Sequence, residues 1–181
     1  MEDSRVVGLC ARYSTLLAIA IINFLLGTSG IFYTIFTPLT IKPVFFILNY
    51  MYGAIMVESD VIFFKGYFAN IIPACIAGAA YFFLLILNMT TPMPMKKRIK
   101  SMLFLWISFL LLNILRIVLF SILVFRGYKY FDFAHIGTWY FGSTIMIVLL
   151  WFVNIKIFNI VNVPAYTDVS YLFGLSRRKG R

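Results

Sequence analysis

The sequence predicts an all-α polytopic membrane protein: a bundle of four to five transmembrane helices with one interfacial or re-entrant helix and a short extracytoplasmic β-hairpin. Composition is the first reason, because 62% of the 181 residues are apolar, 19% are aromatic and only 12% are charged, far from the balance of a soluble domain. The second reason is that several apolar runs have the length of a membrane span. The segments between them are short, so we expect one integral membrane domain covering residues 1–181.

The first half of the chain contains one apolar run of spanning length and one shorter run. Residues 13–36 predict a spanning helix with some tilt or a break near Gly27 and Gly30, and the run lacks a convincing cleavage site, so we expect it to remain as an anchor. In the next run, TPLTIKPVFFILNYMYGAIM, only about 14 uninterrupted residues follow Pro43, whereas crossing requires roughly 20. Residues 39–57 are therefore expected to form the interfacial or re-entrant helix.

The rest of the chain predicts a hairpin and three spans. VIFFKGYFANII, residues 61–72, has two β-prone runs around Lys65-Gly66, which favours a hairpin on the membrane surface. Spans are expected at about residues 75–91, 101–125 and 133–158. The first two are separated by TPMPMKKRIK, whose prolines and basic residues indicate a loop.

Membrane orientation follows from the placement of the basic residues. Most of the 16 Lys and Arg residues lie near the start of the chain, in the KKRIK loop and in the tail, residues 159–181, which ends SRRKGR. The positive-inside rule places these segments in the cytoplasm and gives four spans with both ends inside. Five spans, with the first residues outside, is the alternative if residues 39–57 cross. Either topology places Cys75 at the extracytoplasmic face of a multi-pass protein of the cell membrane.

The net charge of +10 is better explained by this orientation than by nucleic-acid binding, because the aqueous segments are too short to build a basic binding face. No metal or other cofactor is expected. The two cysteines, Cys10 and Cys75, have a spacing that suggests neither a disulfide framework nor a zinc site. Cys10 is given no role. A lone cysteine is more often an inert small hydrophobe than a nucleophile, so Cys75 must be judged by its surroundings.

Arg116, in LLNILRIVLF, lies inside a predicted span, where a guanidinium is costly unless it is paired, hydrated or turned inward. Its long side chain can extend toward the outer end of the helix. Asn113 lies three residues earlier on nearly the same helix face and can hydrogen-bond to Arg116 or to backbone. Taken alone, this pair is explained equally well as a polar contact that locks two helices together.

His135, the only histidine, begins the last predicted span on the same outer side as Cys75. Thr138 and Gly142 follow on the same helix face and form a small, partly polar stripe toward the bundle. Taken alone, such a histidine is more often a satisfied interfacial residue. Together with Cys75 and Arg116 it completes the parts of an activated nucleophile: a thiol, a base that moves its proton, and a cation that stabilises negative charge.

Three separated stretches carry a resemblance to a known family: PACIAGAAYFFLLIL, KKRIKSMLFLWISFLLLNILRIVLF and FDFAHIGTWYFGSTIMIVLLWF. In order and spacing they resemble the core of the exosortase/archaeosortase family, as in a short archaeal-type member, over roughly residues 35–158. The resemblance implies a cysteine transpeptidase with Cys75, Arg116 and His135 as catalytic residues and Asn113 in support. It also implies secreted substrates whose C-terminal signal has a short motif, one hydrophobic helix and a basic cluster. Such enzymes remove the helix and pass the new C-terminus to a membrane lipid.

One difference from the family pattern bears on substrate preference: many members follow the cysteine with Ser-Gly, and this chain has Ile76-Ala77. Two other functions stay open on the residues alone. A small transporter or channel subunit would use Arg116 to line a polar pathway, with His135 titrating at its mouth. A scaffolding membrane protein would use the buried arginine only to fix helix packing, and would tolerate Arg116→Lys.

Overall fold

A computed structural model describes residues 2–26 and 30–160 of the chain, and most of them are helical. The predicted basic tail lies outside the described residues from residue 161 onward. The elements, in chain order, are α1 (Glu2–Leu26), α2 (Ile31–Tyr52), β1 (Ile55–Met56), β2 (Val61–Phe64), β3 (Tyr67–Asn70), α3 (Pro73–Ile76), α4 (Gly78–Thr90), α5 (Met95–Phe125), α6 (Phe131–Gly137), the π-helix η2 (Thr138–Gly142) and α7 (Ser143–Ile157).

Three described helical stretches are long and apolar enough to cross a membrane: α2, the α3–α4 stretch Pro73–Thr90, and α5. Two further apolar helical segments, Tyr13–Ile22 and α7, are shorter. The described part of the chain therefore has the helices of a membrane protein, with three of spanning length where the sequence predicted four or five spans.

The predicted division of the first half of the chain is wrong. The expected span at residues 13–36 is two helices, because α1 ends at Leu26 and α2 begins at Ile31. The expected break near Gly30 is present, since Gly30 has extended backbone at the N-cap of α2. The expected interfacial helix at residues 39–57 is not a separate element, because α2 continues without interruption to Tyr52.

Pro43 misled the prediction because it was taken as a boundary, whereas both Pro38 and Pro43 lie inside α2. A proline inside a helix removes one backbone hydrogen bond and crowds the preceding turn. The helix persists because its buried face, which includes Phe36, Val44 and Leu48, packs in a bundle with α4 and α5. Such packing regularly overrides helix propensity, and proline is well tolerated in membrane-spanning helices.

The predicted hairpin is confirmed. Strands β2 and β3 pair in antiparallel register around Lys65 and Gly66, which both have positive φ, 50° and 86°, as a two-residue type I′ turn requires. The sequence did not predict β1, which adds a third antiparallel strand of only two residues on the far side of β2. Ile62 and Phe64 of β2 are buried and attach the sheet to the bundle.

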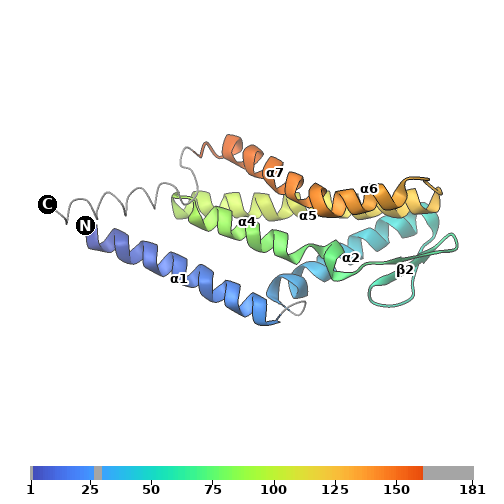
Figure 1. Cartoon of the computed structure of the whole chain (residues 1–181), viewed down its shortest axis with the longest axis horizontal. Coiled ribbons are helices and arrows are strands. Elements are labelled where there is room, and N and C mark those ends of the chain that lie inside the picture. The colour runs from blue at the N-terminus through green and yellow to red at the C-terminus, as the bar shows by residue number, and fades with distance from the viewer. Residues whose placement is uncertain (1, 27–29, 161–181) are drawn as a thin grey trace.

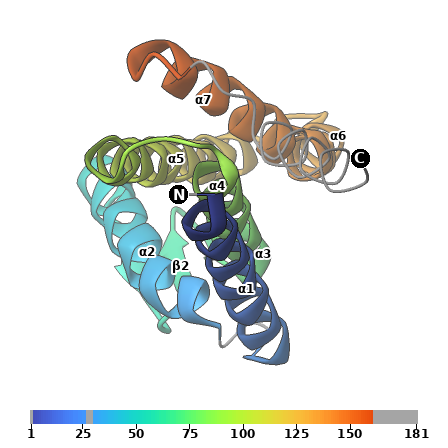
Figure 2. The same cartoon turned by 90° about the vertical axis from the view of Figure 1, so that its left-hand side faces the viewer.

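The sheet and the start of α6 lie at one end of the elongated molecule, and the connection from α4 to α5 lies at the other end (Figure 1). Viewed along the bundle, α5 lies between α2 and α7 and contacts both, and it also packs against α4 (Figure 2). The helix that carries Asn113 and Arg116 is therefore central in the bundle.

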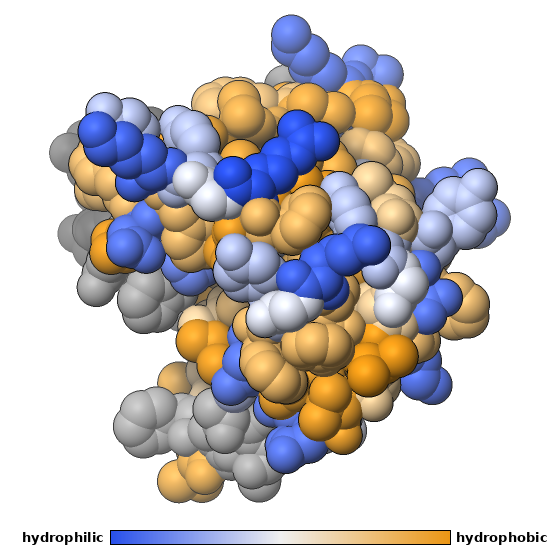
Figure 3. Space-filling model, turned by 90° about the vertical axis from the view of Figure 1, so that its right-hand side faces the viewer, coloured by the Kyte–Doolittle hydropathy of each residue, from blue (hydrophilic) through white to orange (hydrophobic). Residues whose placement is uncertain are grey.

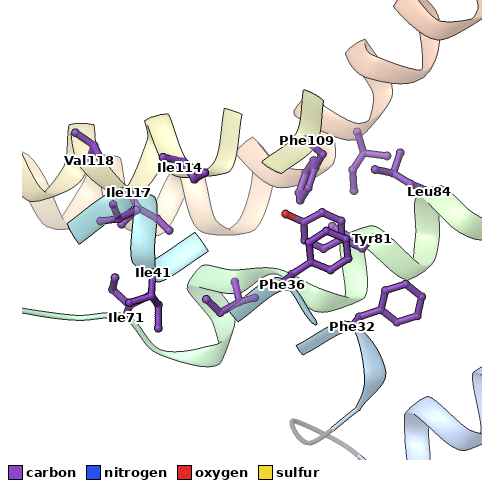
Figure 4. Close-up of a cluster of buried hydrophobic side chains, with 14 of the residues drawn as sticks. Phe32, Phe36, Ile41, Ile71, Tyr81, Leu84, Phe109, Ile114, Ile117 and Val118 are labelled. Carbon is purple, nitrogen blue, oxygen red and sulfur yellow. The ribbon is translucent and has the colours of Figure 1, made fainter. Parts of the chain in front are cut away.

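The core has an aromatic layer and an aliphatic layer (Figure 4). In the aromatic layer, Phe36 of α2 stacks on Tyr81 of α4 with ring centroids 3.5 Å apart, and Phe109 of α5 meets Tyr81 edge-on at 5.0 Å. In the aliphatic layer, Ile71 lies just before α3 and is buried, as is Ile117 of α5. This core joins α2, α4 and α5 beside the segment that carries Cys75.

Candidate active site

A cavity of about 430 Å³ lies at the sheet end of the bundle, between β3, α3, α5 and α6. Its volume is within the range of small ligand sites. Cys75, Arg116 and His135 all line it, from three different helices. The four predicted site residues thus divide into three that face the cavity and Asn113, which is fully buried behind it.

Cys75 lies on α3, a helix of only four residues, and is half-buried. Pro73 occupies the first turn, where its missing N–H costs nothing, and the Cys75 N–H donates to the Ile72 carbonyl oxygen at 2.8 Å. Ala77 ends the helix in the left-handed conformation, with φ of 57°. A residue with a Cβ rarely adopts this conformation, so surrounding contacts must hold the kink between α3 and α4.

Because the helix is kinked at Ala77, backbone carbonyl groups beside the thiol lack the N–H donors that a continuous helix would supply. In a continuous α-helix the Ala80 N–H would donate to the Ile76 carbonyl, but here it donates to Ala77 at 2.9 Å. The Asn113 side chain replaces the missing donor: its Nδ2 donates to the Cys75 carbonyl oxygen at 2.9 Å and approaches that of Ile76 at 3.4 Å. Asn113 therefore fixes the backbone of the cysteine to the centre of α5.

Arg116 of α5 bonds to both α3 and α7. Its Nη2 donates to the Cys75 carbonyl oxygen at 3.3 Å, and its Nη1 donates to the Ser143 Oγ, at the start of α7, at 2.8 Å. Both acceptors are neutral, so these bonds hold the guanidinium in place without cancelling its charge. A half-buried, oriented cation at a cavity wall is suited to stabilising an anion that develops inside the cavity.

His135 is held by aromatic packing. Its ring stacks on Phe131 with centroids 5.3 Å apart and planes 11° from parallel, and it meets Phe120 edge-on at 5.3 Å. The side chain lines the cavity and is still exposed, so it lies at the cavity rim. An imidazole in that place can exchange protons both with a group inside the cavity and with the outside.

Sequence reasoning missed four features of this site. Ser143, the partner of Arg116, follows Gly142 directly, but it lies off the helix face that Thr138 and Gly142 share, so that stripe does not select it. The π-helix η2 precedes Ser143, and such segments often occur at functional sites. The left-handed Ala77 has no sequence signal, because alanine normally favours continuous helix. The position of β3 beside the cavity depends on tertiary packing, so no local sequence pattern predicts it.

The polar groups that line the cavity have the chemistry of acyl transfer on a thiol. Within residues 2–26 and 30–160, no group of three or more His, Cys, Asp or Glu side chains is placed to hold a metal ion. A thiol, an imidazole and a fixed guanidinium around one cavity are the groups needed to form and resolve a thioester. Comparisons of this chain with protein-family models, with curated proteins and with solved structures find no match.

Proposed function

We propose that this protein is a membrane-embedded cysteine protease or transpeptidase. It cleaves the C-terminal sorting signal of secreted surface proteins and transfers the new C-terminus to a membrane lipid. The observation that carries the proposal is that Cys75, Arg116 and His135 line one cavity although they come from three helices far apart in the sequence. The resemblance of the sequence around these residues to the exosortase/archaeosortase family supports the same activity.

The chemistry divides into two acyl transfers. His135 takes the proton of Cys75, and the thiolate attacks a peptide carbonyl of the substrate, forming a C–S bond and an oxyanion that Arg116 stabilises. The C–N bond then breaks, and His135 returns the proton to the leaving amine, which departs with the hydrophobic helix. A hydroxyl, an amine or water next attacks the thioester, loses its proton to His135 and releases the thiol.

Membrane topology supports an extracytoplasmic site. The cavity lies at the opposite end of the bundle from the Lys/Arg-rich start of α5, which the positive-inside rule places in the cytoplasm. In this arrangement α2, α3–α4, α5 and the run α6–η2–α7 make four alternating crossings. The substrate's own hydrophobic helix lies in the bilayer beside the bundle, which explains how an enzyme can act on secreted proteins with so few aqueous residues.

A polar pathway for transport is the second candidate function, and the observation that raises it is a buried network of polar side chains at the other end of the bundle. Asn88 Nδ2 donates to Ser101 Oγ at 2.8 Å, and Ser101 Oγ donates to Asn154 Oδ1 at 2.9 Å. Along α5, however, Leu105 and Phe109 are fully buried between this network and the cavity. Because an apolar layer separates the polar groups, the network favours helix packing over a continuous pathway, and Cys75 would have no role in transport.

The proposal is tested by mass spectrometry of the C-termini of surface proteins from cells that produce either the wild-type protein or Cys75→Ala. We expect intact hydrophobic C-terminal helices to accumulate in the cells with Cys75→Ala only. If the C-termini are the same in both, the protease proposal is wrong.

A further inference from the structure

Strand β3 lies just before the candidate nucleophile Cys75 in the chain. It is an edge strand of the sheet, which has the order β1-β2-β3, and four residues lie between Asn70, its last residue, and Cys75. Its side chains Tyr67 and Phe68 are large, apolar and exposed, at 41% and 67%. Exposed edge strands readily pair with another extended chain, and proteins usually cover or blunt them.

Strand β2 occupies one side of β3. The Ile71 N–H donates to the Asp60 carbonyl oxygen at 2.8 Å, so Asp60 and Ile71 form a hydrogen-bonded pair at the end of the β2–β3 ladder. Hydrogen-bonded and non-hydrogen-bonded pairs alternate along an antiparallel ladder. In the same register, Ala69 and Tyr67 therefore also direct their N–H and C=O groups toward β2.

The backbone groups of Phe68 and Asn70 point the other way, to the free edge of β3. The cavity runs along this edge. All four residues of β3 line the cavity, as do Ile71 and Ile72. Because side chains alternate between the two faces of a strand, a cavity over one face would be lined by every second residue only. Lining by successive residues therefore indicates that the cavity reaches the free edge of β3, while Phe64 of β2, which also lines it, shows that the cavity extends over the buried side of the sheet.

The charges of the cavity indicate which peptide fits it. Its described lining contains Arg116 and His135 and no Asp or Glu side chain. Lys65 adds a further basic residue in the turn that begins β3. Viewed from this end, the molecule carries hydrophilic side chains among hydrophobic surface, as suits a site at a membrane boundary (Figure 3). A segment with basic side chains would be repelled, whereas an uncharged or acidic segment complements the cavity.

We propose that the substrate segment that carries the scissile bond binds as an added strand on the free edge of β3. This uncharged or acidic segment exchanges backbone hydrogen bonds with Phe68 and Asn70, and its direction along the edge delivers a peptide carbonyl to Cys75. The inference rests on the proposed protease function and defines its mode of substrate recognition. In strand addition the backbone bonds supply affinity and the side chains only tune it. One site can then accept the varied sequences around a short motif.

The test uses proline, which removes one backbone N–H. Asn70→Pro and Phe68→Pro each remove an N–H from the free edge and leave the bonds to β2 intact, since proline is tolerated at outward positions of edge strands. Asn70→Ala keeps the N–H and removes only the side chain. Met56→Pro is the matched control on the opposite edge: the Val57 N–H donates to Val61 at 2.9 Å, so by alternation Met56 faces outward from β1.

Each variant is compared with the wild type and with Cys75→Ala by the fraction of surface proteins that keep the hydrophobic C-terminal helix, normalised to the amount of variant in the membrane. We expect cleavage to slow about tenfold in Asn70→Pro and Phe68→Pro, as for one lost backbone hydrogen bond, to slow less in Asn70→Ala, which keeps the N–H, and to stay near wild type in Met56→Pro.

Four results would contradict strand addition. Wild-type cleavage in both proline variants would overturn it, provided that Cys75→Ala is inactive. If Cys75→Ala also cleaves normally, the protease function itself fails. Loss of both proline variants from the membrane would show that these N–H groups serve the fold, which also overturns the proposal. Conversion of a dimer to a monomer with unchanged cleavage would assign the edge to a second copy of the chain.

Discussion

Asn113 Nδ2 lies 2.9 Å from the carbonyl oxygen of Cys75, so a buried amide of α5 holds the backbone of the proposed nucleophile. This bond exists because Ala77 adopts the left-handed conformation and ends α3 immediately after Ile76. The reactive side chain is therefore positioned through its own backbone, by a residue that does not need to contact the substrate. We describe Asn113 as a positioning residue.

Asn113→Ala should lower both stability and cleavage. The substitution leaves the carbonyl oxygens of Cys75 and Ile76 without their amide donor, which costs about 1–3 kcal/mol for a buried acceptor. Asn49→Ala is the matched control, because Asn49 Nδ2 donates to the Ala54 carbonyl oxygen at 2.6 Å, outside the cavity lining. We expect both variants to lower the thermal midpoint in detergent, and Asn113→Ala alone to slow cleavage per folded molecule. Equal effects on cleavage would contradict the positioning role.

Arg116→Lys should nearly abolish cleavage and change stability little. The guanidinium reaches Ser143 with one nitrogen and the Cys75 carbonyl with another, and a single ammonium cannot reproduce this planar geometry. Loss of an oriented oxyanion donor costs about 100-fold in rate. Cleavage and thermal midpoint are measured together. Ser143→Ala is included because it removes the hydrogen bond between Arg116 and Ser143 and keeps the charge of Arg116. A scaffold role for Arg116 predicts instead that the Arg116→Lys protein cleaves normally and keeps a thermal midpoint close to that of the wild type.

His135→Phe should leave the fold intact and remove activity. A phenyl ring retains the stacking on Phe131 and the edge contact with Phe120, but it carries no proton. General acid–base catalysis contributes about 100- to 10,000-fold, so cleavage should fall by at least the lower value. The control is Phe131→Leu, which loosens the packing and keeps the imidazole. If His135→Phe cleaves as well as Phe131→Leu does, His135 serves packing and the proton transfer must be assigned elsewhere.

Arg98, a buried arginine near the start of α5, should prove structural. Its guanidinium donates to the carbonyl oxygens of Asn88, Met89 and Thr91 at 2.7, 2.9 and 3.0 Å, and so satisfies the C-terminal end of α4. Arg98→Ala leaves several buried acceptors unpaired and should cost on the order of 3 kcal/mol. The thermal midpoint should fall clearly, while cleavage per folded molecule is unchanged. A selective loss of cleavage would mean that this end of the bundle takes part in the reaction.

Local patterns predicted the parts of the fold that local chemistry determines. The Lys65-Gly66 turn was visible because Gly66 suits positive φ and two β-prone runs flank the pair, and the apolar run after Ser101 lies within α5. A separate helix at residues 39–57 was predicted wrongly because Pro43 was taken as a helix boundary, whereas it lies inside α2. Its effect depends on the packing of α2 against α4 and α5, which no local pattern records.

In the candidate site, too, some residues could be predicted from the sequence and others could not. The chain has two cysteines and one histidine, and Arg116 lies inside a predicted span, so Cys75, Arg116 and His135 could be selected from the sequence, and the predicted topology placed them at one end of the bundle. Ser143 could not be selected, because a single serine in an apolar helix has no distinguishing pattern. No sequence pattern predicts that the carbonyl groups at the end of α3 lose their helical donors, since this depends on the backbone conformation of Ala77 alone.

The most direct test of the account is to look for the thioester itself. Wild-type protein is acid-quenched in membranes that contain its surface proteins, digested and analysed by mass spectrometry for acyl adducts on cysteine. We predict a peptide adduct on Cys75 that hydroxylamine removes, and none on Cys10, whose exposed thiol serves as the internal control. An adduct that is absent from Cys75, or equally abundant on Cys10, would contradict the claim that this cavity forms a covalent intermediate.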